Sequence, residues 1–224
     1  ADFDGDGKTD LSVFRPSDGN WFAIKSGGGF LVQNWGISTD VLTPGDFDGD
    51  GKADTAVFRP STGQWFVLRS GTSTVDVVSW GIATDKPVPA DFDGDGKTDE
   101  AIFRPSEGNW YVLKSGGGVG VTNWGIASDK LVPADYDGDN KDDIAVFRPS
   151  DGNWYVLKSG GGVGVTNWGI ATDVPVPGDY DGDGKDDVAI YRDGTWFVIQ
   201  SNAGVMVANW GVTTDKPIPA RYIP

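Results

Sequence analysis

Two residue types that build many functional sites are missing from this sequence, which contains no cysteine and no histidine. Without cysteine, disulfide bonds neither stabilise the fold nor report the compartment in which the protein works. Without histidine, the chain lacks the commonest general base and every Ser-His or Cys-His arrangement for nucleophilic catalysis. Two of the commonest residues of enzyme active sites are therefore absent.

Basic residues and long apolar segments are also scarce. The formal net charge is −15, whereas proteins that bind nucleic acids carry basic patches. No apolar run approaches the ~20 residues that span a membrane. We therefore expect no nucleic-acid partner and no membrane insertion. The 34 glycines and 38% hydrophobic residues are typical of a turn-rich all-β protein, and 224 residues suffice for one large domain.

Glutamate is nearly absent too, since Glu100 and Glu107 stand against 31 aspartates. Most of these aspartates belong to a nine-residue loop that occurs five times, with starts 44 or 45 residues apart. Every copy has Asp at loop positions 1, 3, 5 and 9, an aromatic residue at position 2 and Lys at position 7. A solvated acidic turn would not keep one spacing through five copies, so the pattern indicates a site.

The chemistry of the loop favours calcium. Four carboxylates on nine residues repel one another unless a cation lies among them, and Ca²⁺ binds 6–8 hard oxygens at roughly 2.3–2.6 Å. Glycine at position 4, and at position 6 in four copies, lets the backbone turn tightly around the ion. The lysine would contribute its carbonyl oxygen while its ammonium group points to solvent. The loops are not EF-hands, because position 12 is apolar instead of a bidentate Glu.

The predicted metal ligands are the same five positions in each copy, and we expect about five Ca²⁺ ions. They are Asp2, Asp4, Asp6, Lys8 and Asp10; Asp46, Asp48, Asp50, Lys52 and Asp54; Asp91, Asp93, Asp95, Lys97 and Asp99; Asp135, Asp137, Asp139, Lys141 and Asp143; and Asp179, Asp181, Asp183, Lys185 and Asp187. In the fourth copy Asn140 replaces the second glycine, and because Asn tolerates positive φ we expect this site to survive.

The repeat length is in the range of four-stranded propeller blades. In the unit that starts at Lys130, strands are predicted at 131–136, 143–148, 153–158 and 163–168, where aromatic and β-branched residues alternate with turn sequences. Prolines gather in the first of these strands, which fits a sheet edge. No window shows helical periodicity. The sequence predicts an all-β fold, a five-bladed β-propeller of four-stranded antiparallel blades.

The two ends of the chain predict how the ring closes. The segment 217–224 copies a first strand, whereas the first blade retains only the end of its own. We therefore predict a single domain, 1–224, with blades at about 1–44, 45–89, 90–133, 134–177 and 178–216, closed by the C-terminal strand. A fragment of a larger propeller is the alternative. Because the chain begins inside a repeat, we expect a processed or cut N-terminus with any signal outside this sequence.

The loop D-x-D-G-D-G-x-x-D followed by an apolar strand such as 187–191 resembles the FG-GAP/VCBS repeats of bacterial secreted proteins, and is similar to the blades of the integrin α-subunit propeller. The resemblance covers the whole chain. It implies a β-propeller with calcium in the hairpin between the first two strands of a blade, and an extracellular or cell-surface role in adhesion or ligand binding. The blades are shorter than integrin blades, so integrin ligand recognition does not carry over.

Two further sets of residues recur in every blade. Ten tryptophans form two sets, and each set has two possible roles, packing within and between blades or a platform on which sugars stack. The sets are Trp21, Trp65, Trp110, Trp154 and Trp196, and Trp35, Trp80, Trp124, Trp168 and Trp210. Five arginines are expected to pair with aspartates, with ligand binding as the alternative: Arg15, Arg59, Arg104, Arg148 and Arg192, with Asp40, Asp85, Asp129, Asp173 and Asp215.

Three classes of function follow from these observations. The first interpretation is a monomeric, calcium-stabilised binding module that recognises carbohydrate or a cell-surface protein. The second is a structural or spacer propeller attached to a secreted enzyme. We do not expect an enzyme, because the carboxylate pairs that could perform acid–base chemistry are already placed as metal ligands and a pair such as Glu100 with Asp76 has no supporting motif.

Overall fold

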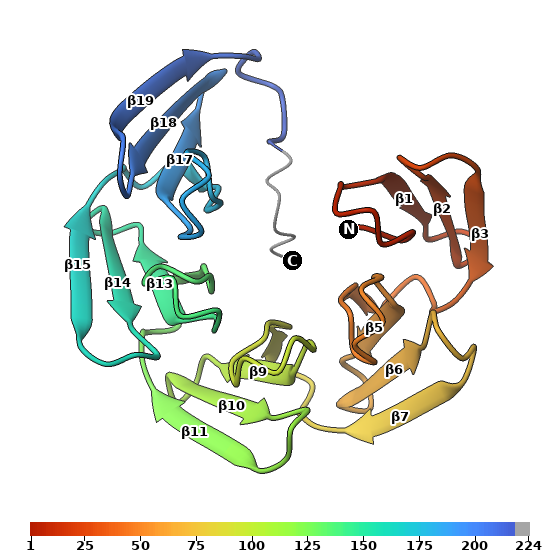
Figure 1. The fold of residues 1–224 in the computed structure, drawn as a ribbon. Coiled ribbons are helices and arrows are strands. Elements are labelled where there is room, and N and C mark those ends of the chain that lie inside the picture. Colours follow the sequence, from red (N-terminus) through yellow and green to blue (C-terminus); the bar gives the residue numbers. More distant parts are fainter. Residues whose placement is uncertain (218–224) are drawn as a thin grey trace. The chain divides into compact units, whose positions relative to one another are not determined.

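The computed structural model describes residues 1–217, and these residues contain strands and no helix. Every strand pairing is antiparallel, and the strands fall into five successive sheets, which we call blades one to five (Figure 1). The predictions of an all-β chain and of a five-bladed β-propeller are therefore confirmed. Within the described residues, no helix has the length and apolar character needed to cross a bilayer.

The blades follow the chain order. Blade one contains β1 (Leu11–Arg15), β2 (Asn20–Ile24) and β3 (Phe30–Asn34). Blade two contains β4 (Val41–Leu42), β5 (Thr55–Arg59), β6 (Gln64–Leu68) and β7 (Val75–Ser79). Blade three contains β8 (Lys86–Pro87), β9 (Glu100–Arg104), β10 (Asn109–Leu113) and β11 (Val119–Asn123). Blade four contains β12 (Lys130–Leu131), β13 (Ile144–Arg148), β14 (Asn153–Leu157) and β15 (Val163–Asn167). Blade five contains β16 (Val174–Pro175), β17 (Val188–Arg192), β18 (Thr195–Gln200) and β19 (Gly204–Asn209).

The first strand of each four-stranded blade is short and lies at an edge of the sheet. In blade two, β4 pairs with β5 through two residues, and an isolated bridge between Gly45 and Asp54 continues the pairing up to the acidic loop. Pro87 and Pro175 lie in the equivalent strands, where a missing N–H costs no ladder bond. The two-residue length is shorter than the predicted strands because the acidic loop begins almost at once.

Blade one has three strands among the described residues. The predicted closing strand, 217–224, lies outside the described residues except for Pro217. Leu11 and Val13 of β1 are exposed, whereas Val57, the counterpart of Val13 in blade two, is fully buried. Ring closure by the C-terminal strand, the blade boundaries and the single-domain assignment stay predictions.

By internal contacts the chain forms two compact units. The first contains Ala1–Pro105 and Asn109–Thr122, and the second contains Ser106–Gly108 and the chain from Asn123 onward. In the first unit, Trp65 on β6 packs with Phe47 and Phe58 into a buried cluster. In the second, Trp154 on β14 packs with Phe147 in the same way. Side chains alternate between the two faces of a strand, and the Trp on the third strand of each of these blades points to the face that packs in the core.

Both tryptophan sets use their indole N–H groups inside the fold. Trp65 Nε1 donates to the carbonyl of Trp80 at 2.9 Å, and Trp80 Nε1 donates to the carbonyl of Tyr111 in the next blade at 3.1 Å. In the second unit Trp154 and Trp168 repeat these two contacts. The first set therefore fills blade cores and the second joins consecutive blades, which confirms the packing interpretation for these members.

The arginines pair with aspartates in the segments that lead from one blade into the next. Arg104 donates from Nε and Nη2 to the two carboxylate oxygens of Asp85, both at 2.9 Å, and its guanidinium lies 4.6 Å from the centre of the Tyr111 ring. Within residues 1–217, four bidentate pairs of this kind are present: Arg59–Asp40, Arg104–Asp85, Arg148–Asp129 and Arg192–Asp173. The ion pair formed by Arg15 is a different one, with Asp18 at 3.7 Å. Structural pairing is confirmed for the four.

Because these ion pairs are buried, truncating one of their arginines should lower the free energy of unfolding by a large amount. The Asp85 side chain is fully buried in its pair, and removing one partner of a buried ion pair costs about 3–5 kcal/mol. We expect Arg104→Ala to lower the free energy of unfolding in urea by that amount. The matched control is Arg69→Ala, because the Arg69–Asp76 pair is about one third exposed on both sides and such pairs contribute about 0–1 kcal/mol. Equal losses in the two variants would contradict the buried-pair account.

Candidate metal centres

In blades two to five, each acidic loop is a hairpin between the short edge strand and the next strand of its blade. In blade two it connects β4 to β5, and Gly49 and Gly51 have φ of 79° and 83°. These left-handed conformations favour glycine. Asn140, which replaces the second glycine in blade four, adopts φ 64°. Asn140 thus adopts the positive φ that the expectation for this loop requires, and the survival of its metal site stays a prediction.

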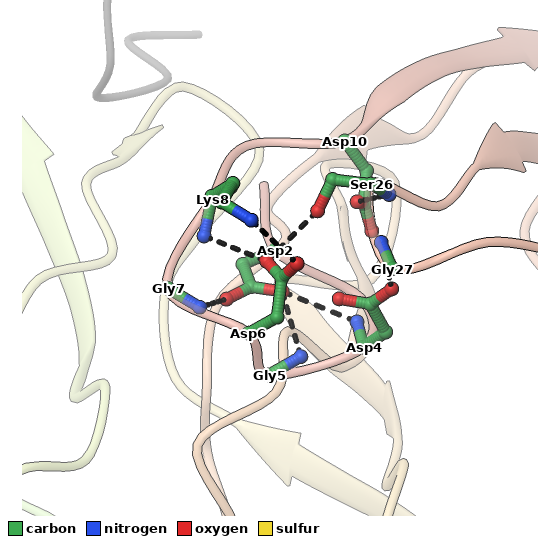
Figure 2. A network of polar contacts seen from close by, with 9 residues as sticks. All are labelled: Asp2, Asp4, Gly5, Asp6, Gly7, Lys8, Asp10, Ser26 and Gly27. Carbon is green, nitrogen blue, oxygen red and sulfur yellow. Dashed lines mark hydrogen bonds and ion pairs between the residues drawn. The ribbon is translucent and has the colours of Figure 1, made fainter.

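The first aspartate of each loop caps the turn from inside. In the first loop, Asp2 Oδ1 accepts from the Gly5 N–H at 2.7 Å and Oδ2 accepts from the Gly7 N–H at 2.8 Å (Figure 2). The same two contacts recur in the other loops, and the N–H groups of Gly184 and Gly182 lower the pKa of Asp179. The Asp179 carboxylate is therefore held ionised, and backbone N–H groups fix both of its oxygens.

Carboxylates at separate loop positions converge on one point. In each loop, three aspartates have carboxylate oxygens that all lie within 4.8 Å of one another. The groups are Asp2, Asp4 and Asp6; Asp46, Asp48 and Asp50; Asp91, Asp93 and Asp99; Asp135, Asp137 and Asp143; and Asp179, Asp181 and Asp187. Three negative charges at such separations repel unless a cation or protons lie among them.

In the first, fourth and fifth loops, position 3 carries an oxygen that the described residues leave without a hydrogen bond. Oδ1 of Asp4, Asp137 and Asp181 is buried and accepts no hydrogen bond in the described structure. An unsatisfied buried carboxylate oxygen is costly, and in each case its residue belongs to the convergent group. A hard cation at the centre would supply the missing partner, so the donor set fits Ca²⁺.

The aspartate at position 9 has a structural task that the sequence does not reveal. Asp54 Oδ2 accepts from the Phe47 N–H at 2.9 Å, and Oδ1 accepts from the Ser70 N–H at 2.6 Å. It thereby joins the start of its own loop to the turn between β6 and β7. Burial raises the pKa of Asp54, and the backbone donors oppose this shift. Asp99, Asp143 and Asp187 have the same two contacts and raised pKa values for the same first cause.

A second hairpin turn forms the wall of each centre, and sequence reasoning missed it. Ser115 Oγ donates to Asp95 at 2.9 Å, and a side-chain carbon at Gly116 would lie only 2.8 Å from Asp93 Oδ2. Equivalent serines contact position 5 in the other blades: Ser26, Ser70, Ser159 and Ser201. The recurring Ser-Gly after the third predicted strand was the available signal, but it reads equally well as an ordinary turn.

The lysines differ partly from expectation. Lys8 Nζ lies 3.4 Å from Asp6 Oδ2, so its ammonium group contacts the acidic loop although the side chain is largely exposed. Its N–H donates to Asp6 Oδ1 at 2.9 Å, a contact that recurs at Lys52, Lys97, Lys141 and Lys185. Coordination of a metal by the lysine carbonyls stays a prediction, as does the complete ligand set.

The fold and its loops define a class of protein, an all-β propeller whose blades each carry one aspartate-rich hairpin. The sequence comparison agrees, because residues 2–57 and 46–102 match the family described as FG-GAP-like repeat. Residues 2–102 therefore contain FG-GAP-like repeats, as the resemblance predicts. The comparison with curated proteins gave no significant match.

Solved structures with the same fold have varied activities. An Agrocybe aegerita lectin described as recognising non-reducing terminal N-acetylglucosamine is 20% identical with a TM-score of 0.64, over 92% of this chain and 64% of the lectin. Virginiamycin B lyase from Staphylococcus aureus is 6% identical (TM-score 0.58), over 91% of this chain and 67% of the lyase. PorZ, a surface component of the type-IX secretion system of Porphyromonas gingivalis, is 14% identical (TM-score 0.55), over 90% of this chain and 26% of PorZ. The chain thus spans slightly less than two thirds of the lectin. At these identities the likeness concerns the fold alone.

Proposed function

We propose that each of the five loops binds one Ca²⁺ and that the ions are part of the fold. The buried, unbonded Oδ1 atoms of Asp4, Asp137 and Asp181 carry this proposal, because each lies in a group of converging carboxylates. The ligands would be the carboxylates at positions 1, 3 and 5, the position 7 carbonyl and the position 9 carboxylate. About five ions would also reduce the formal charge of −15 to −5.

We further propose that this calcium-stabilised propeller is an extracellular binding module for carbohydrate or for a surface protein. The FG-GAP-like repeats at residues 2–102 and a fold shared with a lectin support this proposal. Extracellular modules bind calcium at about 10⁻⁴–10⁻³ M, which suits loops whose ligands come from one short segment. Blades three and four are nearly identical in sequence from 103 to 127 and from 147 to 171, so a ligand that binds one blade should bind its neighbour.

The tryptophans are weak candidates for carbohydrate stacking, with one exception. Members of both sets donate their indole N–H to backbone carbonyls and lie in blade cores or between blades. Trp210 is 81% exposed and ends the repeat series in the described residues. Its counterparts Trp80 and Trp168 contact the following blade, so Trp210 offers an aromatic platform for a sugar ring only where no blade packs against it.

A spacer propeller without a ligand of its own is the second candidate function. Residues that recur in the repeats, such as the paired arginines and the tryptophans, already have a structural task. This favours the spacer function, because such residues need no ligand to explain them. The shared fold with virginiamycin B lyase does not add an enzymatic candidate, since that likeness is at 6% identity and the chain has no histidine.

A glycan array separates these two functions. The protein is applied in millimolar calcium, after removal of metal, and as the Trp210→Ala variant, with Phe30→Ala as a control for another exposed aromatic residue. The binding-module proposal predicts a signal for a defined carbohydrate class that requires calcium. If no glycan and no extracted surface protein binds above background in calcium, the spacer function replaces the binding module.

A further inference from the structure

We infer that neighbouring loops bind calcium cooperatively, because one peptide group provides a proposed metal ligand in one loop and a hydrogen bond to the preceding loop. This inference rests on the proposed calcium sites and adds the coupling between them. The contacts that carry it join consecutive loops within each compact unit. They concern loop position 8, which has no role in the predicted ligand set and whose side chain varies between Thr, Ala and Asp.

In each case the N–H at position 8 donates to the carbonyl of the first aspartate of the preceding loop. In the first unit, Ala53 donates to the Asp2 carbonyl and Thr98 donates to the Asp46 carbonyl, both at 2.6 Å. In the second unit, Asp186 donates to the Asp135 carbonyl at 2.6 Å. These N···O distances are short for backbone hydrogen bonds, whose usual value is about 2.9 Å.

The donor and a proposed metal ligand are opposite ends of one peptide group. The N–H of Ala53 and the carbonyl of Lys52 share the peptide bond between these residues, and the Lys52 carbonyl is a proposed ligand in the second loop. A cation at that carbonyl polarises the planar peptide group, so the N–H becomes a stronger donor to the Asp2 carbonyl. Asp2 provides the first carboxylate of the preceding centre. Occupying one site therefore favours the loop conformation that the other site requires.

Two other contacts keep consecutive loops in register. A side-chain carbon at Gly49 would lie 2.9 Å from Lys97 Cε, so the Lys97 chain lies directly against the preceding loop. In the second unit the Asp186 carboxylate also accepts from the Asp135 N–H at 3.0 Å. The loops are therefore in van der Waals and hydrogen-bond contact, and one cannot change conformation independently of the next.

The test removes the linking N–H. Calcium titration by calorimetry is compared for the whole chain, for Ala53→Pro and Thr98→Pro, and for a control variant at position 8 that keeps its N–H. The control is Thr98→Ala, which keeps the linking N–H and gives position 8 of the third loop the alanine of the second loop. We expect a Hill coefficient above 1 for the unaltered chain. Each proline variant should weaken binding at the joined pair about fivefold or more, the lower end of typical couplings, and Thr98→Ala should change it by less than about twofold.

A reciprocal measurement covers the case in which a proline prevents folding. Disabling the first loop by Asp4→Ala with Asp6→Ala should lower the affinity of the second loop, and Asp48→Ala with Asp50→Ala should lower that of the first by the same factor. Independent affinities in this experiment, with calcium still bound, would overturn the coupling and leave the calcium sites standing. Absence of calcium binding in the unaltered chain would overturn the proposed function itself.

Discussion

In millimolar calcium the protein should unfold tens of degrees above its midpoint in excess chelator. Each loop brings four carboxylates together, so without metal the five loops carry twenty negative charges. One site at 100 times its Kd stabilises a fold by about 2.7 kcal/mol, and five such sites by roughly 13. A typical domain has a total stability of about 5–15 kcal/mol. For a chain of this size each kcal/mol moves the midpoint by about 2–4 °C.

Circular dichroism during heating measures this difference in the unfolding midpoint. A variant with one disabled loop shows how much of the difference a single site contributes. Asp93→Ala with Asp95→Ala disables the third loop and should reproduce about one fifth of the drop, because the other four loops remain intact. Asp18→Ala with Asp151→Ala removes the same charge from exposed turns outside the loops, and should leave the calcium dependence unchanged. If the unaltered protein has the same midpoint with calcium and with chelator, the loops do not stabilise the fold.

Trp65→Ala should cost about 3–5 kcal/mol, the usual loss for a large buried aromatic residue. Trp65 is fully buried between Phe47 and Phe58, and its indole N–H donates to the Trp80 carbonyl at 2.9 Å. The substitution therefore opens a cavity in blade two and leaves a buried carbonyl without that donor. Urea unfolding in calcium measures the loss in the free energy of unfolding.

Two variants locate the origin of that loss. Trp65→Phe keeps an aromatic ring and removes the donor, so it should lose less than the alanine variant. Phe30→Ala truncates an aromatic residue that is 77% exposed, and surface changes of this kind usually stay within about 0.5 kcal/mol. A loss for Phe30→Ala as large as that for Trp65→Ala would contradict the assignment of the first tryptophan set to the core.

The features that local sequence determines were predictable. Proline in the first strand indicates a sheet edge, and Pro87 and Pro175 lie in such strands. A residue at the turn position of Gly51 needs positive φ, and Asn140 adopts it in blade four. Pairing between the recurring arginines and aspartates was predictable from their presence in every repeat, whereas the partner was not: each described pair joins an arginine to the aspartate 19 residues before it, as in Arg59 with Asp40.

The features that depend on sheet register were not predictable. Asp54 accepts from the Ser70 N–H, sixteen residues away, and Gly116 lies against Asp93, twenty-three residues away. Such contacts arise only when the second hairpin turn of a blade folds back over the acidic loop. The bond from Ala53 to Asp2 additionally requires two blades to pack side by side. No local signal in the sequence marks any of these partners.

The location of the metal tests the account most directly, and anomalous diffraction from crystals grown in calcium measures it. We expect five anomalous peaks, one per loop, each bonded to the carboxylates at positions 1, 3, 5 and 9 and to the lysine carbonyl at roughly 2.3–2.6 Å. In each peak's first shell we expect Oδ1 of the position 3 aspartate, the atom that Asp4, Asp137 and Asp181 leave without a hydrogen bond. Loops without anomalous density at millimolar calcium, with their aspartates bonded only to water and backbone, would contradict it.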